Sequence, residues 1–301
     1  MKRIKEFFTL DLREIIIVSL IVFVSVGLVF LVLYNREMLI RVADAFHEPS
    51  EQENSSDKSG SDISSLVENE GMRSDCNVVG INFHGGVVTY LGGESMFAPS
   101  DDVSSEWIVS SIDSANEDDQ VKAIVLEIDS PGGDPVSAEE IANALKFAKK
   151  PTIALIRGRG YSAAYWAATG ADRIFASKSS DVGSIGVTMS YSKDLDENLK
   201  FVSLSTGKYK DLGNPDKPLT EDDRKVLMDS LYILKDNFVK AVAENRNIPV
   251  KKVEALADGN TYLGEEALAL GLIDEIGSWR EVDAYLEKEI GVKPEICWKS
   301  E

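Results

Sequence analysis

Residues 122–148, KAIVLEIDSPGGDPVSAEEIANALKFA, begin as a short β-rich run, pass through a glycine turn and continue as an amphipathic stretch with helical spacing from 136 to 148. Two further β-rich runs are VVGINF (78–83) and TIALI (152–156), and a second helical stretch covers 103–115. Strands that alternate with helices form parallel βαβ units, whose ligand sites gather at the carboxyl ends of the strands. The sequence therefore predicts an α/β domain with a site at these strand ends.

Glycine-rich segments follow two of the predicted strands. SPGG (130–133) ends the run at 122–129, and RGRGYSAAYW (157–166) follows TIALI and turns into an alanine-rich helix, which places Ser162 at a strand-to-helix junction. A serine at the start of a helix most often caps it by accepting a bond from an N–H of the first turn. Two more segments favour a catalytic role instead: GSIGV (183–187) and the polar loop GKYKDLGNP (207–215).

Serine, glycine turn and lysine are together the parts of a Ser-Lys hydrolase. A hydroxyl is a poor nucleophile at neutral pH, so a neighbouring base must take its proton as it attacks a carbonyl carbon. Lysine can be this base only when neutral, and burial among apolar groups lowers the pKa of an ammonium group. Backbone N–H groups in a glycine turn can point at the developing oxyanion, a contribution of about 3 kcal/mol per donor.

In this order, SPGG, the serine motif, GSIGV and the GxxKD loop resemble the signal peptide peptidase A family of membrane-anchored Ser-Lys serine proteases. The resemblance covers about 78–286, including GNTYLGEEA (259–267) and GLID (271–274). It implies an α/β, crotonase-like βαβ superhelical domain related to Clp-type protease subunits. It also implies an endopeptidase that degrades remnant signal peptides and other apolar segments at the membrane, without a metal or another cofactor.

The resemblance assigns a role to each site residue. Ser162 is the nucleophile, Lys210 is the general base, Ser184 hydrogen-bonds the lysine amine, and Gly133 donates its N–H to the oxyanion. Lys208 is a rival for the base, and only the aspartate that follows Lys210 favours Lys210 by pattern.

Several positions depart from the family pattern. The family usually has two glycines after the serine, where this chain has Ala163 and Ala164. Tyr161 stands where a small residue is common, and Asp129 stands where an asparagine is frequent. These changes leave the nucleophile and the base in place, so we expect them to affect specificity more than activity.

The N-terminal part of the chain predicts a membrane anchor. Residues 15–33, IIIVSLIVFVSVGLVFLVL, carry no charge and rise about 28 Å as a helix, enough to cross the hydrocarbon core of a bilayer. Four cations lie within 1–14, so the positive-inside rule places this end in the cytoplasm and the rest of the chain outside. A cleaved signal peptide is the alternative, but no AxA-like site follows Leu33 closely.

The remainder divides into three parts. Residues 34–75 predict a flexible tether, because 44–75 hold nine acidic residues against two basic ones and few apolar side chains. The peptidase domain is expected over 76–290, and residues 291–301 are expected to form a C-terminal tail.

Composition excludes several functions. A formal net charge of −19 argues against binding to nucleic acid, because phosphate neutralisation needs clustered cations. Two cysteines without a CxxC spacing and two histidines leave little room for a metal site. A bond between Cys76 and Cys297 would join both ends of the domain in an oxidising compartment, but we expect two unpaired thiols.

The number of domain copies bears on assembly. A single copy without an internal repeat resembles the family members that form homo-oligomeric rings, in which the lysine can come from the neighbouring subunit. A site within one chain is the alternative. The amphipathic segment 222–243 and the C-terminal helix near Trp279 are candidate subunit contacts, although we expect their apolar residues to belong to the core.

Three other functions compete with this interpretation. A Clp-type Ser-His-Asp peptidase needs a histidine after the serine, and none follows Ser162. His84 lies on or just after the first predicted strand, and we expect it to be a loop residue near the site. A crotonase-type acyl-CoA enzyme would not need Lys210, and a domain outside the cytoplasm would not meet acyl-CoA. A catalytically silent membrane scaffold is the third, and the intact Ser162, Ser184 and Lys210 argue against it.

Overall fold

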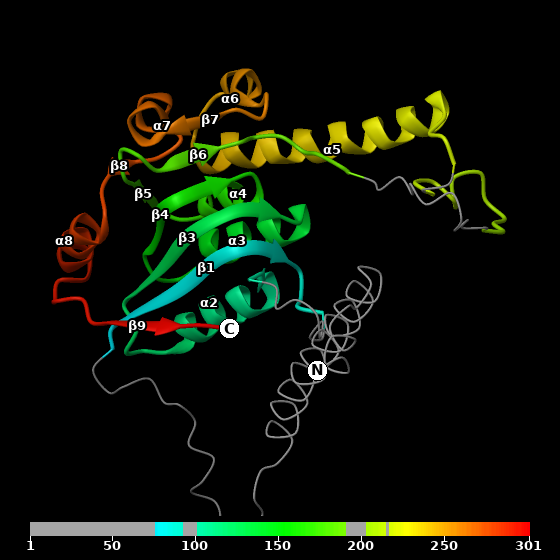
Figure 1. The fold of residues 1–301 in the computed structure, drawn as a ribbon. Helices are drawn as coiled ribbons and strands as arrows, with labels where there is room; N and C mark the ends of the chain where they lie inside the picture. Colours follow the sequence, from blue (N-terminus) through cyan, green and yellow to red (C-terminus); the bar gives the residue numbers. More distant parts are fainter. Residues whose placement is uncertain (1–75, 93–100, 191–202, 215–216) are drawn as a thin grey trace, which may run out of the picture. The chain divides into compact units, whose positions relative to one another are not determined.

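The computed structural model describes residues 76–92, 101–190, 203–214 and 217–301 (Figure 1). The predicted anchor at 15–33 and the predicted tether at 34–75 lie outside these residues. Within the described ranges, no helix combines the length and the apolar character needed to cross a membrane.

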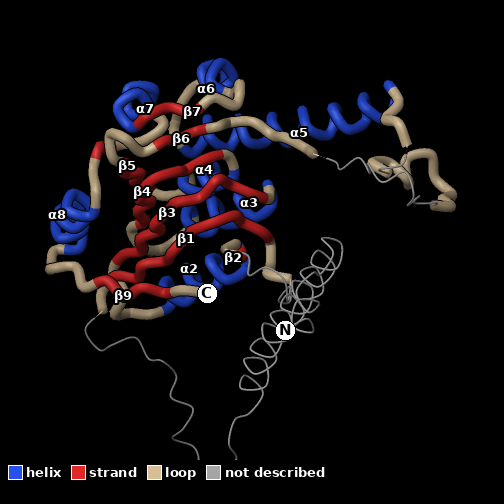
Figure 2. The backbone as a smooth tube through the Cα atoms, in the orientation of Figure 1, coloured by secondary structure: helices blue, strands red, loops and turns tan. Residues whose placement is uncertain are grey.

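A mostly parallel sheet forms the centre of the described domain (Figures 1 and 2). Its main path runs β2-β1-β3-β4-β5-β8, β9 pairs with β1, and β6 joins β4 to the antiparallel β7. The strands are β1 (Val78–Val88), β2 (Val103–Ser104), β3 (Ala123–Gly133), β4 (Thr152–Tyr161), β5 (Arg173–Ala176), β6 (Asp181–Gly183), β7 (Thr261–Leu263), β8 (Glu275–Ile276) and β9 (Ile296–Lys299). The helices are α2 (Ser105–Glu117), α3 (Pro135–Lys146), α4 (Ala163–Ala168), α5 (Glu221–Asn245), α6 (Val250–Leu256), α7 (Gly264–Leu270) and α8 (Trp279–Ile290). The predicted α/β class and the order of strands and helices from 78 to 166 are confirmed.

The two faces of the sheet bury different sets of side chains. Ile124, Leu126 and Ile128 of β3 belong to the larger core, together with residues of α2, α3, α4 and α5. The alternate residues Ala123 and Val125 belong to a second core that α8 completes. Strands covered on both faces read as continuous apolar runs, which explains why AIVL carries no polar residue.

The second face changes character towards the carboxyl end of the strands. There β3 continues with Glu127 and Asp129 on the side where Ala123 and Val125 pack against α8. These carboxylates line an open pocket of about 610 Å³ instead of a core. Helices therefore cover this carboxyl end of the sheet on one face only.

The C-terminal residues contribute to the sheet. Residues 291–301, which we expected to form a tail, contain β9, and β9 pairs in parallel with the first half of β1. Trp298 of β9 lies against Gly80, where a β-carbon would come within 2.6 Å of the indole. The Glu301 carboxylate accepts a hydrogen bond from the Ser104 N–H at the start of α2, at 2.8 Å.

The expectation of two unpaired thiols is wrong. Cys76 and Cys297 form a disulfide, with their Cα atoms 5.8 Å apart and a sequence separation of 221. The pairing of Val79 with Cys297 brings β9 alongside the start of β1, and this places the two cysteines on neighbouring segments. Nothing in the local sequence around ICWK indicated that this short run pairs with a strand more than 200 residues away.

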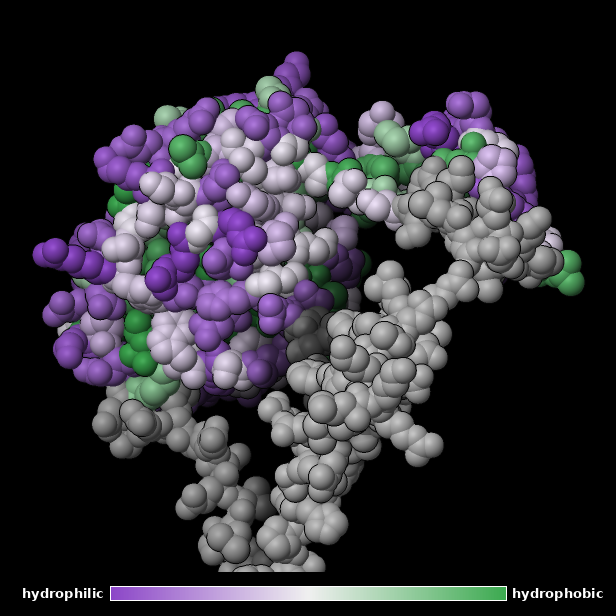
Figure 3. All heavy atoms as spheres, viewed as in Figure 1, coloured by the Kyte–Doolittle hydropathy of each residue, from purple (hydrophilic) through white to green (hydrophobic). Residues whose placement is uncertain are grey.

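The long helix α5 is only partly a core helix. Phe238, Val239 and Val242 near its C-terminal end are buried, and the Phe238 ring stacks on Trp166 of α4 with the ring centroids 5.0 Å apart. Tyr232 and Ile233, one to two turns earlier, are 61% and 63% exposed. Figure 3 shows hydrophobic side chains on this part of the molecule. The core interpretation therefore holds for the end of the helix and not for its first half.

Candidate active site

Ser162 begins α4 with a backbone conformation that is rare for serine. Its φ of 51° and ψ of −121° lie in the left-handed half of the map, where the side chain of an L-residue is strained. Its N–H donates to the Gly183 carbonyl at 2.8 Å, and its carbonyl accepts from the Trp166 N–H at 2.9 Å. The hydroxyl makes no capping bond to α4. The common role of an N-terminal serine is therefore absent, because a capping serine has extended backbone and its oxygen accepts from the first turn.

Ser184 lies at the end of the strand next to Ser162. The ladder between β4 and β6 ends with Tyr161 paired to Gly183, and each serine directly follows this last pair. Ser184 also has a positive φ of 51°, and its N–H donates to the Asn260 carbonyl at 2.8 Å. Two serines with strained backbones therefore lie next to each other at the ends of adjacent strands.

The glycine turn after β3 lies against the same point. A β-carbon at Gly132, whose φ is +100°, would come within 2.9 Å of the Ser162 β-carbon and 3.0 Å of the Ala163 nitrogen. A β-carbon at Gly133 would meet the Val87 carbonyl at 2.1 Å. Both positions therefore require glycine. The absence of a side chain lets the SPGG backbone pack directly against Ser162.

Lys210 lies apart from the two serines. It is exposed and belongs to the turn at 207–213, and within the described residues no hydrogen bond or ion pair joins its side chain to Ser162 or Ser184. The neighbouring Tyr209 hydroxyl donates to Asp222 at the start of α5, at 2.9 Å. Asp222 and Phe238 are sixteen positions apart on α5, a rise of about 24 Å. Figure 1 shows the lysine loop at the far end of this helix, so the structure divides the predicted site in two.

The two candidate lysines differ in their partners. Lys208 forms an ion pair with Asp222, and its Nζ lies 4.8 Å from the centre of the Tyr209 ring. The hydrogen bond with Asp222 raises the pKa of Lys208, which holds this amine in its charged form. Lys210 has no ion pair among the described residues. Of the two, only Lys210 has an amine without an ion pair to another described residue.

The aspartate after Lys210 organises the lysine loop. Asp211 accepts bonds from Lys217, from the Ser203 hydroxyl and from Asn214, whose Nδ2 lies 3.1 Å from Oδ1. These bonds lower the pKa of Asp211 to about 2, and the bond from Lys217 has the largest effect. In the GxxKD pattern, the aspartate that follows Lys210 therefore holds the lysine loop together by hydrogen bonds.

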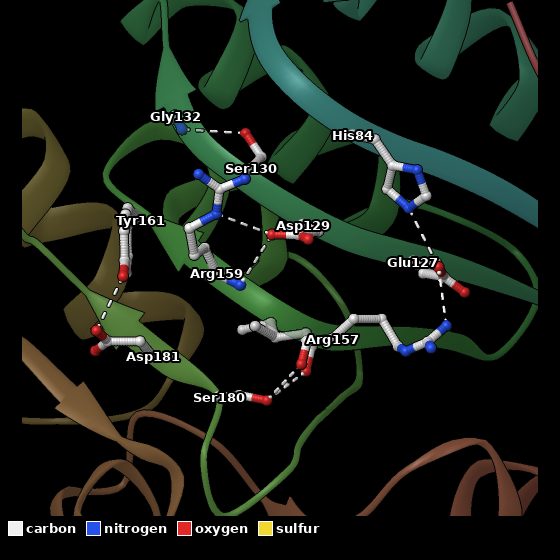
Figure 4. Close-up of polar contacts among 11 residues, drawn as sticks. His84, Glu127, Asp129, Ser130, Gly132, Arg157, Arg159, Tyr161, Ser180 and Asp181 are labelled. Atoms are coloured by element: carbon white, nitrogen blue, oxygen red, sulfur yellow. Dashed lines mark hydrogen bonds and ion pairs between the residues drawn. The ribbon is translucent and has the colours of Figure 1, made fainter. Parts of the chain in front are cut away.

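Figure 4 shows a row of charged side chains on the open sheet face, which sequence reasoning missed. The buried Glu127 binds His84 Nε2 at 3.2 Å, Arg157 Nη1 at 3.1 Å and the Trp279 indole N–H at 3.1 Å. His84 lies within β1, so its expected place in a loop is wrong. The available signal was the i, i+2 spacing of Glu127 and Asp129, which places both on one face of the strand.

Two further contacts involve Arg159 and Tyr161, which shortly precede Ser162 in the chain. Arg159 Nε lies 3.0 Å from Asp129 Oδ1, and the Tyr161 hydroxyl donates to Asp181 at 2.9 Å. Burial and the bond to Asp181 raise the pKa of Tyr161. Ala163 and Ala164, the residues that follow the serine, are buried in the main core.

The chain is similar in sequence to known proteases. A model of peptidase family S49 matches residues 144–293, and a model of Clp protease matches residues 95–181. A protein of Methanocaldococcus jannaschii named "Putative protease" is 34% identical over 69% of this chain and 68% of its own length. The "Putative signal peptide peptidase SppA" of Enterococcus faecium is 31% identical over 68% of this chain and 61% of its own. The "Serine protease SPPA, chloroplastic" of Arabidopsis thaliana is 29% identical over 69% of this chain and 32% of its own.

Proposed function

Because the chain belongs to peptidase family S49, the signal peptide peptidase A family, we propose that it is a serine endopeptidase with Ser162 as nucleophile and Lys210 as general base. This proposal rests on one observation. Ser162 has a strained backbone, its hydroxyl does not cap α4, and it lies between Gly132 and Ser184. Strain of this kind persists only where the surrounding structure imposes it, and a sharp strand-to-helix turn that exposes a hydroxyl is a recurrent arrangement for a nucleophile.

Acylation follows from the roles of these groups. The Ser162 oxygen attacks the carbonyl carbon of the scissile peptide, and the neutral Lys210 amine takes the hydroxyl proton. The new C–O bond places negative charge on the carbonyl oxygen, to which the Gly133 N–H donates. The intermediate collapses when the C–N bond breaks and the lysine ammonium returns the proton to the leaving amine.

Deacylation repeats these steps with water. Lys210 takes a proton from water as the water oxygen attacks the ester carbon. The bond between this carbon and the Ser162 oxygen then breaks, and the ammonium returns the proton to that oxygen. Ser184 hydrogen-bonds the lysine amine and keeps its lone pair directed at the nucleophile. Ser184 suits this role because it leaves the strand next to that of Ser162.

Assembly supplies the lysine in this proposal. Lys210 lies on a loop at the start of α5, roughly 24 Å along the helix from the residue that stacks on α4. The exposed apolar side chains of Tyr232 and Ile233 on the same helix suit a contact with a second copy. The Clp-like part of the chain also suggests oligomeric assembly. We propose that a ring neighbour brings its Lys210 to Ser162.

The proposed location is outside the cytoplasmic membrane, with the N-terminus inside and residues 15–33 as an uncleaved anchor. The Cys76–Cys297 disulfide supports this location, because structural disulfides persist in oxidising compartments. The proposed substrates are remnant signal peptides and other apolar segments that reach the enzyme from the bilayer. The acidic domain would repel anionic headgroups, so substrates arrive by their own apolar segments.

The test uses the full chain in detergent and a fluorogenic apolar peptide. Ser162→Ala and Lys210→Ala should each lower kcat by about 10³-fold or more, while the matched variant Lys208→Ala keeps most activity. An equimolar mixture of Ser162→Ala and Lys210→Ala chains, unfolded and refolded together, should regain part of the activity if the lysine acts between subunits. Full activity of Lys210→Ala would refute the dyad, and absence of activity in the assembled wild type would favour a scaffold.

A further inference from the structure

The strand that carries Ser162 changes its register just before the serine. Ile128 of β3 pairs with Ile156 of β4, but Ser130 pairs with Gly160. One residue of β3, Asp129, therefore faces the three residues 157–159 of β4. This is a bulge in a parallel pair, and a bulge bends its strand and changes the direction of the residues that follow.

The bulge is the point where β4 exchanges one neighbour for another. Before it, Ile153 to Ile156 pair with β5, and from Arg159, the last residue of the bulge, to Tyr161 the strand pairs with β6. The second pairing leads directly to the bond between the Ser162 N–H and the Gly183 carbonyl, at 2.8 Å. The position of the nucleophile thus depends on how the bulge is held.

Asp129 fills the bulge from the open face of the sheet (Figure 4). Its Oδ1 accepts from the Arg159 backbone N–H at 3.2 Å and lies 3.0 Å from Arg159 Nε. The same oxygen would lie 3.1 Å from a β-carbon at Gly158, so the carboxylate rests against the backbone of the bulge. One carboxylate oxygen therefore fixes both the main chain and the side chain of the residue three positions before the serine.

We propose that Asp129, through Arg159, is a positioning residue that holds the bulge of β4 and thereby sets the backbone of Ser162. The inference rests on the proposed nucleophile and names the group that keeps it in place. The negative charge matters because a carboxylate holds a guanidinium more strongly than a neutral amide oxygen does. An asparagine at position 129, the residue that is frequent in the family, would keep an acceptor for the Arg159 N–H and lose most of the pull on the guanidinium. In this chain, where Arg159 pairs with Asp129, the inference therefore replaces the sequence-based expectation that Asp129 affects specificity more than activity.

This role can be separated from folding. The Asp129 and Arg159 side chains are 43% and 50% exposed, and ion pairs this exposed contribute little to stability. Arg173 and Glu275 form a comparable pair between β5 and β8, with side chains 42% and 43% exposed. Glu275→Gln is therefore a matched control that removes a half-exposed carboxylate from the same sheet without touching β4's bulge.

The test measures how fast a fluorophosphonate probe labels the full chain in assembled form. The probe reports the geometry of the nucleophile and does not depend on the identity of the substrate. At saturating probe, Asp129→Asn should label about 10-fold more slowly and Asp129→Ala about 100-fold more slowly, since small misplacements of reacting groups cost factors of this size. The concentration for half-saturation should change little, and Glu275→Gln should label at the wild-type rate.

Labelling of both Asp129 variants at the wild-type rate would overturn the inference. Equal losses in the Asp129 variants and in Glu275→Gln, in step with their melting temperatures, would also overturn it, because the effect would then be one of stability. Failure of the proposed function has a different signature: the wild type would not label, or Ser162→Ala would label as fast as the wild type.

Discussion

Removal of the Cys76–Cys297 disulfide should strongly destabilise the domain. The bond closes a loop of 221 residues. The chain-entropy relation then gives a loss of about 18 cal/mol/K in the unfolded state, or about 5 kcal/mol at 25 °C. For a domain of this size the melting temperature should fall by about 10–20 °C. The change should appear in the double variant Cys76→Ala/Cys297→Ala.

The assay is urea unfolding of the full chain in detergent, followed by tryptophan fluorescence. Trp279 and Trp298 lie edge to face with ring centroids 5.0 Å apart, so they report on the region that β9 completes. Wild type treated with a reductant should unfold at the same urea concentration as the double variant, and the reductant should not change the double variant. A loss below about 1 kcal/mol, or two alkylatable thiols in unreduced wild type, would refute the reasoning.

Three further results are expected. Gly132→Ala should lower kcat by about 100-fold in the peptide assay, with a smaller effect on melting temperature. The added β-carbon would lie 2.9 Å from that of Ser162, and a small displacement of the nucleophile lowers the rate strongly. An unchanged kcat would show that the turn can move away. Phe238→Ala should destabilise the domain by about 3–5 kcal/mol in urea unfolding, since the ring is buried on Trp166, and a loss under 1 kcal/mol would show that α5 is not anchored there. Asp211 has its pKa lowered to about 2 in the fold, so its support of the lysine loop is complete above its ordinary pKa and is lost as pH falls through about 2. The protection factors of residues 203–214, measured by hydrogen exchange relative to the unfolded chain at the same pH, should fall over this range in wild type and should already be low at neutral pH in Asp211→Asn.

The sequence predicts the local elements well because their signals are local. The strands at 78–83, 122–129 and 152–156 and the helices at 103–115 and 136–148 follow from side-chain periodicity, and each is present with shifted ends. The strands run longer than expected, to Val88, Gly133 and Tyr161, because pairing with neighbours continues through the glycine segments. Glycine weakens a strand on its own, so propensity alone ends the strands too early.

The features that were missed depend on partners far away in the chain. The pairing of β9 with β1, the disulfide and the position of His84 beside Glu127 all join segments between 43 and 221 residues apart. The bulge of β4 is also invisible in the sequence, because it arises from the register between two strands that are each regular in composition. Resemblance supplied the identity of the site residues, and the fold alone shows that Ser162 and Ser184 are adjacent while Lys210 is not.

The division of the site has a chemical consequence. Ser162, its strained backbone and the glycine turn are all held by β3, β4 and β6, and none of these contacts involves the lysine loop. In the proposed mechanism, the part of the site that needs accurate geometry therefore lies within one chain, since an oxyanion donor works only when it is fixed before the reaction. The base has a looser requirement, because a proton can be taken by an amine on a flexible side chain once that amine is neutral and within hydrogen-bond reach. An exposed lysine in water stays charged, whereas one covered at a subunit contact loses its proton more easily. Under the proposed mechanism, delivery of Lys210 by a neighbour would therefore place the amine at Ser162 and cover it in one step, and an unassembled chain would keep Ser162 in position without a base to activate it.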